Sequence, residues 1–226
     1  MPSVKIPKKS TATDMTPFVD VAFLILSFFI MATKFKPPAP VEITTPNSVS
    51  TDKLPENDAI MVELDKEGRV FFTMLAQGND GNEAKRSVIE NLNKTRNLGL
   101  SEAEMKNFVN TVGIGVPFAQ LKSYLAMTPD QQKNVKQPGI PVRDSANNEL
   151  YYWVRDAYNA FSGKKINYLI KGDNNSVYPD FKHVLEAFTK NDIYKFQLVT
   201  TPEEAPVGSD LYRTRTLGGG KPAASK

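Results

Sequence analysis

The sequence predicts an α+β protein with a single N-terminal transmembrane helix, an extended proline-rich linker and a small folded domain. Three observations predict this fold class. Residues 18–32 form an almost unbroken apolar run, and residues 36–56 contain five prolines. Short apolar strands and amphipathic helices follow from residue 57. We expect the folded domain to be a β-β-α-β-α-β sandwich with a mostly helical insertion.

A polar tail, residues 1–13, precedes the predicted transmembrane helix, which we place at residues 14–35. Its centre is FVDVAFLILSFFIMA (residues 18–32), where thirteen of fifteen residues are apolar and only Asp20 and Ser27 are polar. A helix over this centre and its immediate neighbours rises about 25 Å, slightly less than a hydrocarbon core of about 30 Å. Three lysines precede the run and two follow it. Together with the large hydrophilic part after the run, this bias favours a cytoplasmic N-terminus.

Asp20 is the candidate proton carrier. An ionised carboxylate near the middle of a bilayer costs about 2.5–3.5 kcal/mol. Protonating an ordinary aspartate at pH 7 costs about 4 kcal/mol. Because the two costs are comparable, an aspartate at lipid depth can both gain and lose its proton.

The polar residues of this helix share one narrow stripe. At 100° per residue, the members fall within about 40° of one stripe; they are Thr13, Thr16, Asp20, Ser27 and Met31. The remaining surface is apolar. A stripe of this kind indicates that Asp20 faces a partner subunit or a hydrated cleft rather than acyl chains.

Two other interpretations of the apolar run stay open. One is a cleaved secretory signal, although no A-x-A site follows and Lys34 occupies the expected cleavage region. The other makes Thr16 the N-cap and Pro17 the first helical residue, so that Asp20 only complements the helix dipole in the first turn.

The composition excludes several function classes. The net charge is only +3, and no basic run alternates with aromatic residues, so we expect no nucleic-acid partner. The chain has no cysteine and a single histidine, His183, which leaves no thiolate chemistry and no multi-histidine metal site. We therefore expect no enzyme, no cofactor and no metal. His183 is expected at the surface and Trp153 in the core.

After the linker (36–56), the folded domain is expected at residues 57–200, with a helical insertion at 75–148 and a disordered tail at 201–226. The linker is either a passive spacer or adds Val41–Ile43 to a sheet edge. The segments with strand character are 59–64, 69–74, 166–171 and 195–200.

Five helices are predicted from residue spacing and from capping motifs. Apolar residues recur at helical spacing over residues 150–161 and again around 181–188. In the insertion a helix is expected at 83–96. Two capping boxes, Ser101 with Glu104 and Thr128 with Gln131, begin two more helices.

Two segments resemble the ExbD/TolR family. DMTPFVDVAFLILSFFIMAT (residues 14–33) is similar to the family's transmembrane motif, N-x-T-P-[FL]-[IV]-D-V followed by an apolar run, with Thr16 to Val21 in register. INYLIKGDNNSVYPDFKHVLEAFTKNDIYKFQLVT (residues 166–200) resembles its last β-turn-α-β unit. In that unit the usual turn positions are Asp173, Val177 and Tyr178.

Three features depart from the family pattern. Asp14 stands where the family often has asparagine, and it is either a second acid at the cytoplasmic mouth or only an exposed residue. VEITTP (residues 41–46) is only loosely similar to the short motif that follows the span in the ExbD branch. The insertion 75–148 has no counterpart in compact members.

The resemblance implies a single-pass inner-membrane protein with a cytoplasmic N-terminus and a periplasmic domain. It implies a homodimer inside a ring of ExbB/TolQ-type subunits, in which Asp20 takes and releases protons within the motif that includes Pro17 and Phe18. A TonB- or TolA-like protein would receive the motion. The ExbD branch, which energises outer-membrane transport, is the leading interpretation. A TolR-like subunit that binds peptidoglycan, and a membrane-anchored binding module without a motor role, are the alternatives.

Overall fold

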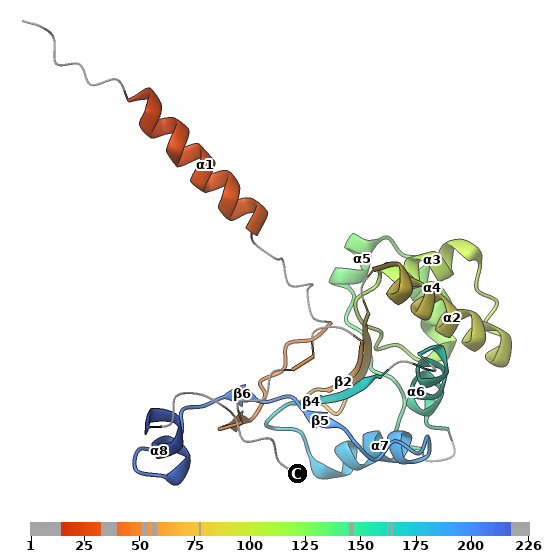
Figure 1. The fold of residues 1–226 in the computed structure, drawn as a ribbon. Helices are drawn as coiled ribbons and strands as arrows, with labels where there is room; N and C mark the ends of the chain where they lie inside the picture. Colours follow the sequence, from red (N-terminus) through yellow and green to blue (C-terminus); the bar gives the residue numbers. More distant parts are fainter. Residues whose placement is uncertain are drawn as a thin grey trace, which may run out of the picture. The chain divides into compact units, whose positions relative to one another are not determined.

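The computed structural model describes residues 15–32, 40–50, 54–55, 58–76, 78–144, 147–161, 163 and 165–217. It divides into two compact units, Met1–Pro37 and Pro38–Lys226. The described part of the first unit is helix α1, Thr16–Ala32 (Figure 1). The second unit mixes helices with two small sheets, which confirms the predicted α+β class.

A four-stranded sheet with the order β3-β2-β4-β5 forms the centre of the second unit. β2 (Ala59–Leu64) and β3 (Val70–Leu75) are an antiparallel hairpin, as predicted. β4 (Asn167–Gly172) runs parallel to β2, and β5 (Gln197–Leu198) runs parallel to β4 at the edge. The predicted order β-β-α-β-α-β is therefore confirmed.

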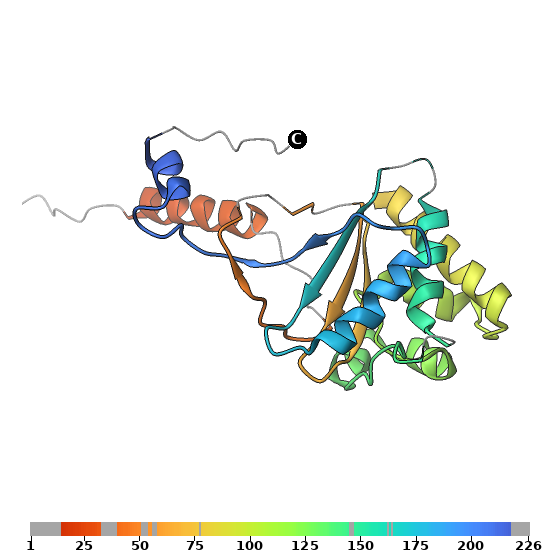
Figure 2. The same ribbon diagram turned by 90° about the horizontal axis from the view of Figure 1, so that it is seen from below.

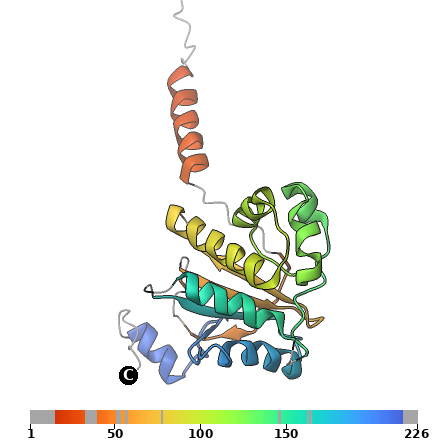
Figure 3. The same cartoon turned by 90° about the vertical axis from the view of Figure 1, so that its right-hand side faces the viewer.

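Three helices cover one face of this sheet: α2 (Gly78–Arg96), α6 (Glu149–Ala160) and α7 (Tyr178–Thr189) (Figure 3). Even-numbered residues of β2 and β3 enter the core beneath them, since successive side chains of a strand point to opposite faces. Trp153 of α6 is fully buried as predicted, with its ring stacked on Phe72 at 5.4 Å and on Phe108 at 5.6 Å. His183 is half-buried rather than at the surface, with Nδ1 3.6 Å from a Glu186 oxygen.

The insertion is mostly helical, and it contributes to the sandwich instead of standing apart from it. Both predicted capping boxes are present, at the starts of α3 (Glu102–Asn110) and α5 (Pro129–Asn134), and α4 spans Phe118–Leu125. The helix expected at 83–96 begins earlier, at Gly78, and its buried residues belong to the main core. The insertion also extends the sheet, because Ile114 pairs with Phe72 of β3.

Residues 40–46, here called the strap, lie on the face of the sheet opposite the three helices (Figure 2). At one end, a Cβ added to Gly113 would lie 2.9 Å from Pro40 Cγ and 2.7 Å from Thr73 Oγ1, which places Pro40 beside β3. At the other end, the Thr44 amide donates to Asp173, just after β4, at 3.0 Å. The strap therefore crosses from β3 to the end of β4, and β2 lies between its two ends.

The C-terminal segment is tied to the chain that follows the strap. β1 (Asn47–Ser48) pairs in parallel with β6 (Thr201–Pro202), and this pair forms the second sheet. Sheet pairing near the linker thus occurs at β1, not at Val41–Ile43. The last main strand is shorter than predicted, because the chain leaves β4 after Val199 and the Thr201 amide bonds to the Pro46 carbonyl at 2.9 Å.

The prediction of a disordered tail from residue 201 is wrong for residues 201–217. These residues contain β6 and a further helix, α8 (Asp210–Leu217), which the low apolar content of the tail did not indicate. Pairing with β1 supplies backbone hydrogen bonds that no local pattern in the tail reveals. Residues 218–226 lie outside the described residues.

Candidate functional site

Asp20 lies beyond the first turn of α1. The helix begins at Thr16, one residue earlier than the cap interpretation expects, and the Val19 amide bonds to the Met15 carbonyl at 3.1 Å. Its first turn contains no acidic residue. Because the helix-dipole effect falls off within the first turn, a purely dipole-complementing role for Asp20 loses its geometric support.

The other side chains of α1 form an exposed apolar sheath. No residue of the helix is buried, and the exposed fraction of its large apolar side chains runs from 52% at Ile25 to 88% at Met31. Phe18, in the family motif beside Pro17, is 70% exposed. An apolar surface of this extent marks a region that other molecules cover, either lipid or protein.

The helix carries most of the predicted polar stripe. Thr16, Asp20, Ser27 and Met31 are all helical, so they share one side of α1 as their spacing requires. Asp20 and Ser27 are two turns apart, about 10.5 Å along the axis. The Ser27 hydroxyl donates to the Leu24 carbonyl at 2.9 Å, which satisfies its proton within the helix. Thr13, the other predicted member, lies outside the described residues.

Among the residues that the structure describes, no helix combines the length and the apolar character of a membrane span. α1 contains 17 residues.

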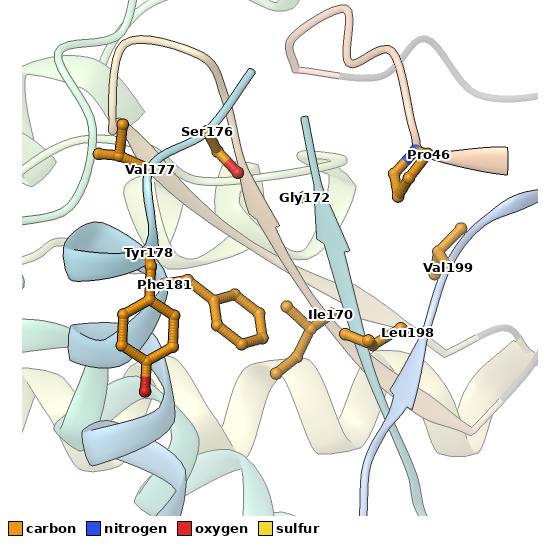
Figure 4. Close-up of a pocket in the computed structure, with 9 residues that line it drawn as sticks. All are labelled: Pro46, Ile170, Gly172, Ser176, Val177, Tyr178, Phe181, Leu198 and Val199. Carbon is orange, nitrogen blue, oxygen red and sulfur yellow. The ribbon is translucent and has the colours of Figure 1, made fainter. Parts of the chain in front are cut away.

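A second candidate site is a groove of about 300 Å³ at the free edge of the sheet (Figure 4). It lies between the start of α7 and the ends of β4 and β5. Its lining is largely apolar and consists of Pro46, Ile170, Gly172, Ser176, Val177, Tyr178, Phe181, Leu198 and Val199. Figure 4 shows Phe181, Ile170 and Leu198 turned toward one another. Tyr178 is 70% exposed and Leu198 is 55% exposed, so apolar surface is available at the rim.

Asp173 fixes the turn beside this groove. Its carboxylate accepts the amides of Asn175 at 2.9 Å and of Thr44 at 3.0 Å, and these two bonds lower its pKa. The Thr44 carbonyl in turn accepts the Asn174 amide at 2.8 Å. The turn that resembles the family pattern therefore holds the strap, and Val177 and Tyr178 of the same turn line the groove.

A family model described as biopolymer transport protein ExbD/TolR matches residues 7–203. The chain belongs to the ExbD/TolR family. The match runs through α1, the strap, the sheet and the insertion up to β6. No curated protein and no solved structure matches the chain. Members of the ExbD/TolR family are transport proteins, not enzymes.

The sequence pointed to Asp20 and the turn residues but missed the contacts around the strap. The available signal for the strap was an alternating pattern. Val41, Ile43 and Thr45 are half-buried, and the residues between them are exposed. Alternation predicts a half-buried extended segment but not the surface that it covers. Within the described ranges, no three His, Cys, Asp or Glu side chains are placed to hold a metal ion.

Proposed function

We propose that this chain is a proton-driven motor subunit of the ExbD type, which energises a TonB-like protein for outer-membrane transport. In this proposal α1 spans the inner membrane with the N-terminus in the cytoplasm, and the second unit lies in the periplasm. Two copies of α1 stand inside a ring of ExbB/TolQ-like subunits. Each unit charge that crosses 100 mV supplies about 2.3 kcal/mol, so several protons can perform mechanical work.

One observation carries this proposal: Asp20 is the only ionisable residue of α1, and every large apolar side chain around it is exposed. A lone carboxylate in an apolar sheath does not stabilise a helix, whereas a proton carrier requires such a group. The stripe of Thr16, Asp20 and Ser27 gives that carboxylate a polar side on which a ring subunit or water can lie.

The decisive variant is Asp20→Asn, which preserves the shape of the side chain and removes its titration. We expect energy-dependent outer-membrane uptake to be lost while the protein level stays normal. The matched control is Asp130→Asn, the same chemical change on an exposed carboxylate in α5, which should leave uptake intact. Full uptake in the Asp20→Asn strain would refute the motor role.

For the TonB- or TolA-like partner, we propose that the groove beside β5 is the docking surface. Extended peptides add to free sheet edges, and apolar pockets next to the edge receive their side chains. Tyr178→Ala should weaken cross-linking of the chain to its partner, whereas Tyr158→Ala, an exposed tyrosine on α6, should not. Equal cross-linking in both variants would exclude the groove.

A TolR-like role in cell-wall attachment is the second candidate, and the insertion favours it. Helices α3 to α5 add periplasmic mass that compact family members lack, and such mass can contact peptidoglycan. Full-length chain in detergent, mixed with isolated peptidoglycan and sedimented, tests this candidate; a chain that stays in the supernatant while a known binder sediments argues against it.

A passive anchor is the third candidate. Replacement of residues 16–33 by a poly-leucine span would leave a passive anchor fully functional. Loss of function in that chimera, at normal protein level, excludes a role as a passive anchor.

A further inference from the structure

Glu63 is a charged residue buried on the face of the sheet that the strap crosses. Ile60, Val62 and Leu64 of β2 belong to the helix-covered core, so Glu63 points to the opposite face. Its side chain is nevertheless 0% exposed. The helices cannot account for this burial, because they lie on the other side of the sheet (Figure 3).

The two ends of the strap lie on either side of the strand that carries Glu63. One end, Pro40, lies beside Gly113 next to β3, the other bonds to Asp173 in the turn after β4, and β2 lies between those strands. In the strand register, Glu63 is opposite Phe71 of β3 and Lys171 of β4. A line between the two ends of the strap therefore crosses β2 close to Glu63.

Glu63 is only partly satisfied in this position. The Lys171 ammonium donates to its Oε1 at 3.1 Å, and the Lys171 side chain is 21% exposed. Among the described residues, Glu63 Oε2 and Thr73 Oγ1 are both buried and neither reaches full hydrogen-bond geometry, although the Thr73 hydroxyl lies close enough to lower the pKa of Glu63. A buried carboxylate with one poorly paired oxygen is poorly solvated, and a proton on that oxygen removes the charge.

Two titratable groups of β4 and its turn lie on this face: Lys171, which bonds to Glu63, and Asp173, which holds the strap through the Thr44 amide. β3 offers the Thr73 hydroxyl and no titratable side chain. The strap has a single titratable residue, Glu42, and it is exposed. At the hairpin turn, Asp65 and Arg69 are bonded to each other at 2.6 Å.

We propose that the strap is a proton-sensitive device: it closes over the sheet when Glu63 is protonated and loosens when Glu63 is ionised. Burial raises the pKa of Glu63, and the charge of Lys171 together with the hydrogen bonds of Lys171 and Thr73 only partly offsets that effect. The closed strap therefore binds a proton more tightly than an open strap, in which water solvates the carboxylate. By linkage, lowering the pH favours the closed state. This device lies in the second unit and does not depend on a proton at Asp20.

The device can be tested in the full-length chain in detergent by thiol accessibility. Because the chain has no cysteine, Ile43→Cys introduces a unique thiol at a half-buried strap position. The labelling rate of the variant unfolded in urea, divided by the labelling rate of the folded variant at the same pH, gives a protection factor free of thiol ionisation. We expect this factor to rise as the pH falls from 8 to 5, by up to about tenfold per pH unit.

Glu63→Gln in the Ile43→Cys background should give high protection that no longer depends on pH. Glu42→Gln, the matched change on the exposed strap carboxylate, should keep the original pH dependence. A flat profile in the Ile43→Cys chain, or an unchanged slope after Glu63→Gln, overturns the proposal.

A second variant covers the case in which Glu63→Gln does not fold, as judged by circular dichroism. Lys171→Met removes the cation that favours the ionised carboxylate, so the protection profile should move to higher pH. A profile that stays in place or moves to lower pH overturns the proposal.

Discussion

The two faces of the central sheet differ in what covers them. One face lies under three helices and an apolar core in which Trp153 is stacked between aromatic rings. On the other face, the seven-residue strap crosses β2 near a buried carboxylate, and one end of the strap is held by the turn at Asp173. One sheet therefore combines a face packed by helices with a face that an extended segment of the chain crosses.

The largest effect should come from the helix-covered face. Trp153→Ala removes the largest fully buried side chain, and the cavity should lower the free energy of unfolding by about 3–5 kcal/mol. Urea unfolding of the full-length chain in detergent, followed by far-ultraviolet circular dichroism, measures this loss. Leu198→Ala, at a half-exposed rim position, is the control and should change stability by less than about 0.5 kcal/mol. Equal losses in both variants would contradict the assignment of the core.

The core face was largely predictable from the sequence, and the strap face was not. The spacing of Leu150, Trp153 and Ala157 predicts a buried helical stripe because burial and helical period act together over a short segment. Ser101 and Glu104 predict a helix start for the same local reason. The bonds from Thr44 to Asp173 and from Thr201 to Pro46 join residues more than 100 positions apart, and no local pattern encodes them.

The candidate functional residues also differ in how well the sequence predicts them. Asp20 stood out because a carboxylate in an apolar run is costly wherever it occurs. Glu63 did not, because nothing in the local pattern of AIMVEL shows that the strand face opposite the core is also covered.

A smaller effect is expected at the insertion. Ser101→Ala removes the hydroxyl that accepts the Glu104 amide at 3.3 Å, and loss of an N-cap costs about 1 kcal/mol. The same urea unfolding measurement detects the change. Because α3 packs on the helix-covered face, the protection factor of a thiol at position 43 should stay unchanged. A change in that factor would show that the two faces are not independent.

The smallest effect on global stability, and the sharpest test of the comparison, concerns the two carboxyl groups of the strap face. The pKa of Asp173 is lowered by the amides that it accepts, so its contribution is present above the unfolded pKa and is lost as the pH falls through the folded pKa. The pKa of Glu63 is raised by burial, so its contribution is full below the unfolded pKa and is lost as the pH rises through the folded pKa.

The two shifts have opposite signs, and they define a window in which Asp173 is ionised while Glu63 is protonated. We expect the strap to be held most tightly within that window, so amide exchange of residues 40–48, corrected for intrinsic rates, should be slowest there and faster on both sides. Asp173→Asn should abolish only the rise in exchange rate on the acid side of the window. Glu63→Gln should abolish only the rise on the alkaline side. A variant that removes both rises at once would mean that the strap responds to global unfolding of the domain rather than to its two carboxyl groups.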